Sequence, residues 1–139
     1  MAIRLVPRPR VLIAEDEAIT ALALAQTLIA YGYEVSGPAA SGAEARSLAE
    51  ADRPVLAIID MRLKDGLTGH VAARDIQDRL GIPVILMSGH ADARMAADLK
   101  AAGFLAKPFA DGELLAMIER ALSPETAAET DLQEAGSTA

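Results

Sequence analysis

Apolar residues along the chain gather in five short runs, each followed by a stretch of helical periodicity. The runs lie at 10–14, 33–37, 55–59, 84–87 and 104–106, and their short, aliphatic character is typical of buried strands. The helical stretches cover 17–31, 41–51, a segment ending at Leu80, 92–102 and 111–122. Five strands alternating with five helices predict an α/β domain whose parallel sheet is covered on both faces through right-handed crossovers.

The predicted helices carry boundary signals and apolar stripes. Ser41 and Glu44 have the spacing of a capping box, and Gly103 is the expected C-terminal cap of the fourth helix. The expected stripes are Ala18, Leu22, Ala25 and Ile29 in the first helix, and Leu115, Ile118 and Leu122 in the last. These stripes are the faces that we expect to pack on the sheet.

Composition narrows the class of protein. With 139 residues, the chain fits one domain, and its 52% hydrophobic but only 3% aromatic content predicts an aliphatic core. No apolar run is long enough to span a membrane, and no secretory signal is visible, so we expect a soluble, cytoplasmic protein. The net charge of -7 argues against a nucleic-acid partner. The absence of cysteine excludes disulfides and thiolate metal sites.

The domain is expected to cover residues 10–122. Residues 1–9 form an N-terminal lead. Residues 123–139 contain four acids, no bases and few large apolar side chains, so they cannot bury enough surface to offset the entropy of ordering. We therefore expect an acidic, disordered tail.

Polar residues follow four of the predicted strands: Glu15 and Asp16, Asp60, Ser88, and Lys107. Each alone has an ordinary explanation, as a helix-start acid, a turn residue, a cap or a solvated lysine. Taken together they are more informative, because a flavodoxin-like strand order of 2-1-3-4-5 brings the strand ends to one edge, where open α/β folds bind ligands. Carboxylates gathered there repel each other, and such an oxygen-rich set favours a hard cation such as Mg²⁺.

These motifs, in this order and at this spacing over roughly residues 10–122, resemble the receiver domain of bacterial two-component response regulators. The motifs are Glu15-Asp16, Asp60, Ser88-Gly89 and Lys107-Pro108. The resemblance implies that Asp60 is a phosphoacceptor, phosphorylated by a phosphohistidine of a partner kinase, and that the protein is not a turnover enzyme. It also implies that Glu15, Asp16 and Asp60 hold Mg²⁺, with the backbone carbonyl of Arg62 as a further ligand.

The resemblance gives the remaining positions their expected roles. Lys107 offsets the charge of the phosphoryl group, and a cis peptide precedes Pro108. Ser88 donates its hydroxyl to a phosphoryl oxygen and, with Phe104, forms a switch; the alternative for Phe104 is a plain core aromatic. Arg62 and His90 tune the lifetime of the acyl phosphate; the alternative for His90 is a solvent-exposed loop histidine.

The expected partners are a sensor histidine kinase or phosphotransfer protein and an unknown downstream target. We expect a stand-alone receiver that signals through protein contacts or acts as a phosphate sink. The region from Asp92 to Leu122, which spans the fourth helix, fifth strand and fifth helix, is the expected dimer or target surface, with Arg94, Lys100 and Arg120 as contact candidates.

Three other classes fit less well. An aspartate-nucleophile phosphatase would have Asp-x-Asp after the first strand, where this chain has Glu15-Asp16-Glu17. A nucleotide-binding protein would need a glycine-rich turn at the same place. A degenerate receiver used only for protein interaction would normally lack one of the acids or the lysine.

Overall fold

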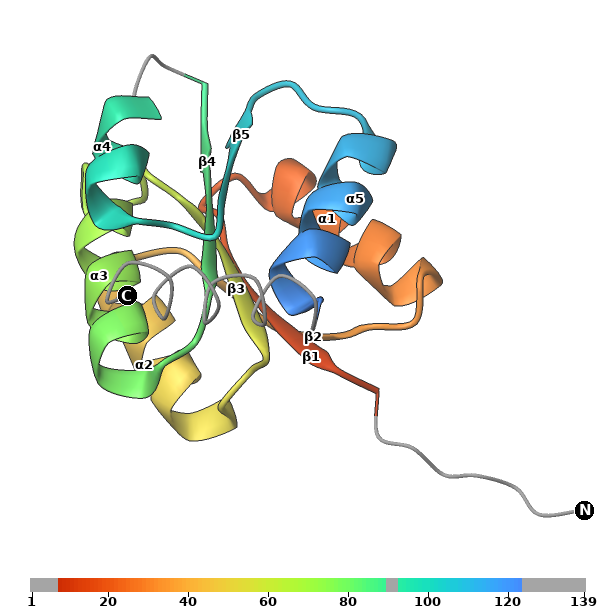
Figure 1. Cartoon of the computed structure of the whole chain (residues 1–139), viewed down its shortest axis with the longest axis horizontal. Coiled ribbons are helices and arrows are strands. Elements are labelled where there is room, and N and C mark those ends of the chain that lie inside the picture. The colour runs from red at the N-terminus through yellow and green to blue at the C-terminus, as the bar shows by residue number, and fades with distance from the viewer. Residues whose placement is uncertain (1–7, 90–92, 124–139) are drawn as a thin grey trace, which may run out of the picture.

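The computed structural model describes residues 8–89 and 93–123 and forms an α/β sandwich (Figure 1). The strands are β1 (Arg10–Ala14), β2 (Glu34–Ala39), β3 (Leu56–Asp60), β4 (Val84–Ser88) and β5 (Gly103–Ala106). The helices are α1 (Ala18–Ala30), α2 (Gly42–Asp52), α3 (Gly69–Leu80), α4 (Ala93–Leu99) and α5 (Asp111–Leu122). The strands pair in parallel in the order β2-β1-β3-β4-β5, which confirms the predicted topology.

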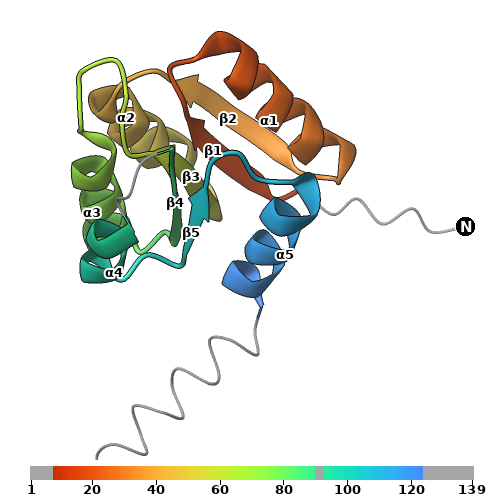
Figure 2. The ribbon, with the colours of Figure 1, turned by 90° about the horizontal axis from the view of Figure 1, so that it is seen from above.

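Helices cover both faces of the sheet, with α1 and α5 on one side and α2, α3 and α4 on the other (Figures 1 and 2). Two hydrophobic clusters fill the layers between the sheet and the helices. Every residue of β3 and β4 is buried, because both faces of these central strands are covered. The polar residues Asp60 and Ser88 that close these two strands are therefore buried as well.

The apolar stripe predicted for α1 is wrong. The buried face consists of Ala21, Leu24 and Leu28, whereas Leu22 and Ile29 are 59% and 52% exposed. The physical reason is that residues 18–30 contain no charged side chain, so apolar residues occupy nearly every direction around the helix. With no polar face to set the phase, helical spacing alone does not identify the inward side.

Two further details differ from the sequence-based expectation. Gly103 is not a helix cap, since α4 ends at Leu99, Lys100 adopts the left-handed φ of 58°, and Gly103 opens β5. Glycine is needed there for close packing, because a Cβ would lie 2.4 Å from the sulfur of Met117. In α5, Leu114 is buried where Leu115 was expected to be.

The N-terminal signal of α2 is confirmed in its main part. The Ser41 hydroxyl accepts a hydrogen bond from the Glu44 N–H over 3.1 Å. The Glu44 carboxylate accepts from the N–H of Ala40 rather than of Ser41.

Several expectations concern residues that the structure does not describe. Residues 124–139 of the predicted tail and residues 1–7 of the predicted lead lie outside the described ranges. Within residues 8–89 and 93–123, no helix is both long and apolar enough to cross a membrane.

Gly69→Ala is expected to lower the free energy of unfolding by about 3 kcal/mol, because a new side chain must be forced into a packed site. A Cβ at Gly69 would lie 1.9 Å from the carbonyl oxygen of Asp60. Gly112 is the matched control, since its Cβ would meet nothing within 4 Å. Gly112→Ala is expected to stabilise by about 0.5 kcal/mol. Urea denaturation measures both, and equal effects would contradict the packing argument.

Candidate functional site

The candidate site lies at the carboxyl ends of the parallel strands. Asp60 closes β3, Ser88 closes β4, Glu15 follows β1 directly, and Lys107 follows β5. The strand ends are aligned, because Asp60 pairs in register with Met87, the neighbour of Ser88 in β4. The N–H of Lys107 donates to the Ser88 carbonyl over 2.8 Å. The structure thus gathers at one edge the residues that follow the predicted strands.

The side chain of Lys107 joins two carboxylates across this edge. Its Nζ lies 2.8 Å from Glu15 Oε2 and 2.5 Å from Asp60 Oδ2. Glu15 and Asp60 are both buried, and the lysine reaches them from a partly exposed position. One ammonium therefore faces two buried carboxylates.

This imbalance of charge shifts the pKa values of the site. Burial, together with the neighbouring Asp60 carboxylate, raises the pKa of Glu15 to about 7, although Lys107 opposes the shift. Burial alone would lower the pKa of Lys107, but its hydrogen bonds to Asp60 and Glu15 raise that pKa above its ordinary value. The site holds more negative charge than its lysine balances, and a bound cation would reduce the repulsion between the carboxylates.

The donor set fits a hard divalent metal. Ligand oxygens of Glu15, Asp16 and Asp60 lie within 4.8 Å of one another, and oxygen ligands of this kind are those that Mg²⁺ uses, together with water and phosphate oxygens. They border a cavity of about 320 Å³ that is also lined by Arg62 and Lys107. The N–H of Arg62 donates to Asp60 Oδ1 over 3.1 Å, which places this backbone beside the cluster.

The other predicted residues are placed less directly. Ser88 is buried at the end of β4, and Gly89 after it lines the cavity. Phe104 lies in β5 opposite Leu86 and packs, half-buried, against the cluster beneath α2, α3 and α4. His90 lies outside the described residues. The lysine is followed by a cis Lys107–Pro108 peptide, as the resemblance implied.

Three residues that line the cavity, Glu17, Thr20 and Leu63, were not identified as site residues from the sequence. Glu17 and Thr20 line the same cavity, and the Thr20 hydroxyl donates to the Glu17 carboxylate over 2.8 Å. The signal was available in part, because Thr20 lies in the first turn of the helix that begins just after Asp16, at the same end of the sheet. A search limited to the residues that follow the strands does not find a site residue that lies in the first turn of a helix.

The affinity for Mg²⁺ is expected to increase about tenfold per pH unit up to about pH 7 and to level off above it, because Glu15 must lose its proton before it can share a cation. Calorimetric titration with Mg²⁺ at several pH values tests this. Glu15→Gln, which cannot titrate, should remove the slope around neutral pH. The same slope in that variant would show that another group releases the proton.

Fold and site together define an open α/β protein whose strand ends carry an acid cluster bridged by a lysine. The family model described as the response regulator receiver domain matches residues 11–119. The chain therefore belongs to the response regulator receiver family, whose members are phosphoacceptors in two-component signalling rather than turnover enzymes. The acid cluster of Glu15, Asp16 and Asp60 is typical of the phospho-accepting site of such a domain, and a receiver implies a histidine kinase partner.

Individual relatives agree with this assignment. The transcriptional regulatory protein PdtaR of Mycobacterium tuberculosis is 39% identical over 123 residues, which cover 85% of this chain and 58% of the relative. The phyllosphere-induced regulator PhyR of Methylorubrum extorquens is 33% identical over 114 residues, which cover 81% and 43%. The receiver domain of a modulated diguanylate cyclase from Desulfovibrio desulfuricans G20 is similar in structure, with a TM-score of 0.79, 32% identity and coverage of 88% of this chain and 99% of that one. The chain thus spans about half the length of these two curated relatives.

Proposed function

We propose that Asp60 accepts a phosphoryl group from a phosphohistidine in a Mg²⁺-dependent reaction. The observation that carries the proposal is the position of Asp60, whose carboxylate lies 2.5 Å from Lys107 Nζ and within the acid cluster at the cavity. A buried carboxylate with an ammonium and a metal-type donor set beside it meets the needs of phosphoryl transfer, which depends on positioning and charge stabilisation.

The proposed step forms an acyl phosphate. A carboxylate oxygen of Asp60 attacks phosphorus, the bond from phosphorus to the histidine nitrogen breaks, and the released imidazole takes up a proton. Mg²⁺, held by Glu15, Asp16, Asp60 and the Arg62 carbonyl, would neutralise the charge that accumulates on the phosphoryl oxygens. Lys107 provides a second positive charge, and the absence of a side chain at Gly89 leaves room for the incoming group.

The surroundings of the site suit a macromolecular phosphodonor. A groove of about 430 Å³ runs between α1 and the segment that follows β5, and Lys107 lines it as it lines the smaller cavity. Its wall includes Thr20 and Leu24 of α1 together with Phe109. A donor seated in this groove would contact Thr20 and Lys107, which also line the cavity beside Asp60.

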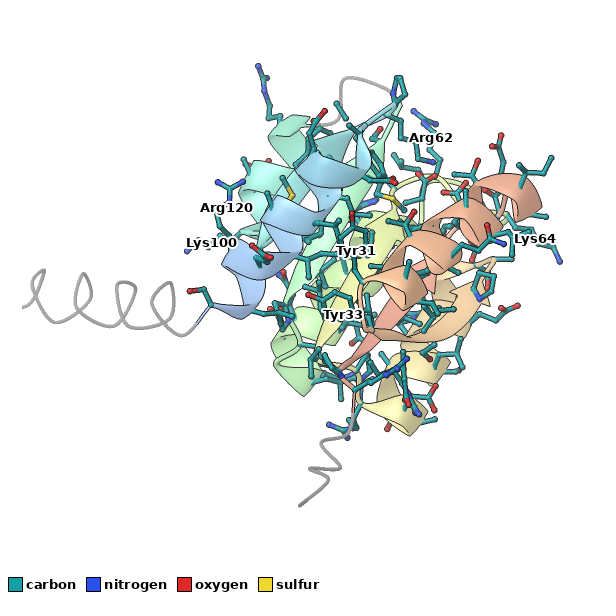
Figure 3. All side chains as sticks on the ribbon, turned by 90° about the vertical axis from the view of Figure 1, so that its right-hand side faces the viewer. Tyr31, Tyr33, Arg62, Lys64, Lys100 and Arg120 are labelled. Carbon is teal, nitrogen blue, oxygen red and sulfur yellow. The ribbon has the colours of Figure 1, made fainter. Side chains whose placement is uncertain are left out.

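The proposed output is a change of protein contacts after phosphorylation. Ser88 would move toward the phosphoryl group, and Phe104 would change its packing as it follows. Lys100 and Arg120 are exposed and project from the same side of the molecule, on the left in Figure 3, while Arg62 lies in the upper part of that view. Lys100, Arg120 and the exposed Arg94 remain our candidates for target or dimer contacts, and Arg62 and His90 for control of the acyl-phosphate lifetime. A phosphate sink is the other form of output that we propose.

Incubation with acetyl phosphate and Mg²⁺, followed by intact mass measurement, tests the proposed chemistry. We expect the chain to gain one phosphoryl group, and EDTA to prevent the gain because the metal is removed. Equal modification with and without EDTA would contradict a metal-dependent site. Phosphotransfer from the histidine kinases of the same cell would then identify the donor.

A further inference from the structure

The β3–α3 loop, residues 61–68, contains the backbone of Arg62 that we expect to bind the metal. Its first turn is tied to the phosphoacceptor, since the Arg62 N–H donates to Asp60 Oδ1 over 3.1 Å. Its middle is closed by reciprocal backbone hydrogen bonds of 2.8 and 2.9 Å between Leu63 and Gly66. The loop is therefore a compact unit, and its position depends on the segments to which it is attached.

Hydrogen bonds attach this loop to the β2–α2 turn, residues 39–42, which includes the last residue of β2 and the first residue of α2. The Lys64 N–H donates to the Ala40 carbonyl over 2.9 Å. Asp65 Oδ1 accepts a hydrogen bond from the Gly42 N–H over 3.2 Å and another from the Thr68 hydroxyl over 2.5 Å. A single carboxylate oxygen thus joins the middle of the loop, its end and the neighbouring turn.

The same turn is also attached to the first metal-binding segment. The Glu15 N–H donates to the Ala39 carbonyl over 2.8 Å. The turn has little room to shift against the loop, because a Cβ at Gly42 would lie 3.0 Å from the Thr68 hydroxyl oxygen. The β2–α2 turn therefore lies between Glu15 on one side and the loop that carries Arg62 on the other.

We propose that Asp65 is a positioning residue for the metal site: it ties the β3–α3 loop to the β2–α2 turn and so fixes the Arg62 carbonyl relative to Glu15 and Asp16. This inference rests on the proposed function. Asp65 is not one of the three clustered acids, so it acts through the backbone of the loop. The hydrogen bond from Thr68, supported by that from Gly42, holds the pKa of Asp65 below its usual value, and the acceptor stays ionised at neutral pH.

Calorimetric titration with Mg²⁺ of the full chain and its variants tests the inference. Asp65→Ala is expected to weaken Mg²⁺ binding about tenfold, the scale of loss when a group that orients a metal ligand is removed. Asp65→Asn keeps an oxygen acceptor without the charge and should remain within about threefold of the unsubstituted chain. Asp75→Ala is the matched control, since this α3 acid pairs with Arg79 and should leave the affinity unchanged. Amide exchange of Gly42 is expected to accelerate in Asp65→Ala alone.

The outcomes separate this inference from the proposed function. Unchanged Mg²⁺ affinity in Asp65→Ala would overturn the inference, and so would an equal loss in Asp65→Asn, which would assign the effect to charge. Should Asp65→Ala fail to fold, Thr68→Val removes one donor to the same oxygen and should weaken binding about threefold; no change there would overturn the inference too. An unsubstituted chain that neither binds Mg²⁺ nor gains a phosphoryl group would instead overturn the proposed function.

Discussion

Lys107→Met is expected to slow phosphorylation by acetyl phosphate about a hundredfold, the scale of loss when one charge-stabilising donor is removed from a transition state. The same change should lower the free energy of unfolding without Mg²⁺ by about 3 kcal/mol near pH 8, because two buried carboxylates lose their cation. The loss should be smaller below the pKa of Glu15, about 7, where that carboxyl holds a proton. Added Mg²⁺ should restore part of the stability.

The control is Lys100→Met, which removes an exposed lysine at the end of α4. It should leave both the phosphorylation rate and the unfolding curve unchanged. Time courses of phosphorylation give the rate, and thermal unfolding at two pH values gives the stability. A Lys107→Met chain whose stability is lowered equally at both pH values would show that the lysine acts through packing rather than charge.

Asp60→Asn is expected to reduce phosphorylation at least about a thousandfold, as the loss of a nucleophile does in general. It should also lower the pKa of Glu15, because the Asp60 carboxylate is one of the groups that raise it. Intact mass measures the first effect, and carboxyl titration by NMR measures the second. Lys107 keeps its bond to Glu15 in this variant, so we expect the fold to remain intact.

Asp16→Asn provides the comparison, since it removes the exposed acid of the same cluster, whereas Lys107 pairs with the two buried acids, Glu15 and Asp60. We expect it to weaken Mg²⁺ binding, so that phosphorylation requires a higher Mg²⁺ concentration but remains measurable there. If the Asp60→Asn chain still gained a phosphoryl group, the acceptor would have to be another residue.

The parts of the fold that sequence predicted well share one physical property. The central strands are apolar at every position before their last residue because both of their faces are covered, so β3 and β4 stand out from their surroundings. The residue that ends such a strand then lies at a known edge of the sheet. The sequence alone therefore places Asp60, Ser88 and Lys107 together, because parallel strands point their carboxyl ends the same way.

The parts that sequence could not predict depend on packing that no local pattern encodes. In α1, apolar residues in every direction hide which side faces the sheet, and Leu24 rather than Leu22 is buried. In the sequence, Gly103 looks like a glycine that caps a helix. In the structure, a side chain at this position is excluded by the sulfur of Met117, which belongs to a helix distant in sequence. The link from Asp65 to Gly42 spans the gap between two loops, and turn chemistry alone predicts only that Asp65-Gly66 bends the chain.

Chemical mapping of the phosphorylated residue tests the central claim most directly. The chain is phosphorylated with acetyl phosphate and Mg²⁺, reduced with borohydride to convert an aspartyl phosphate to homoserine, digested and sequenced by mass spectrometry. We predict homoserine at position 60 and at no other carboxylate. Conversion at Glu15 or Asp16, or a phosphoryl group retained on Ser88 after reduction, would contradict the assignment of Asp60 as the phosphoacceptor.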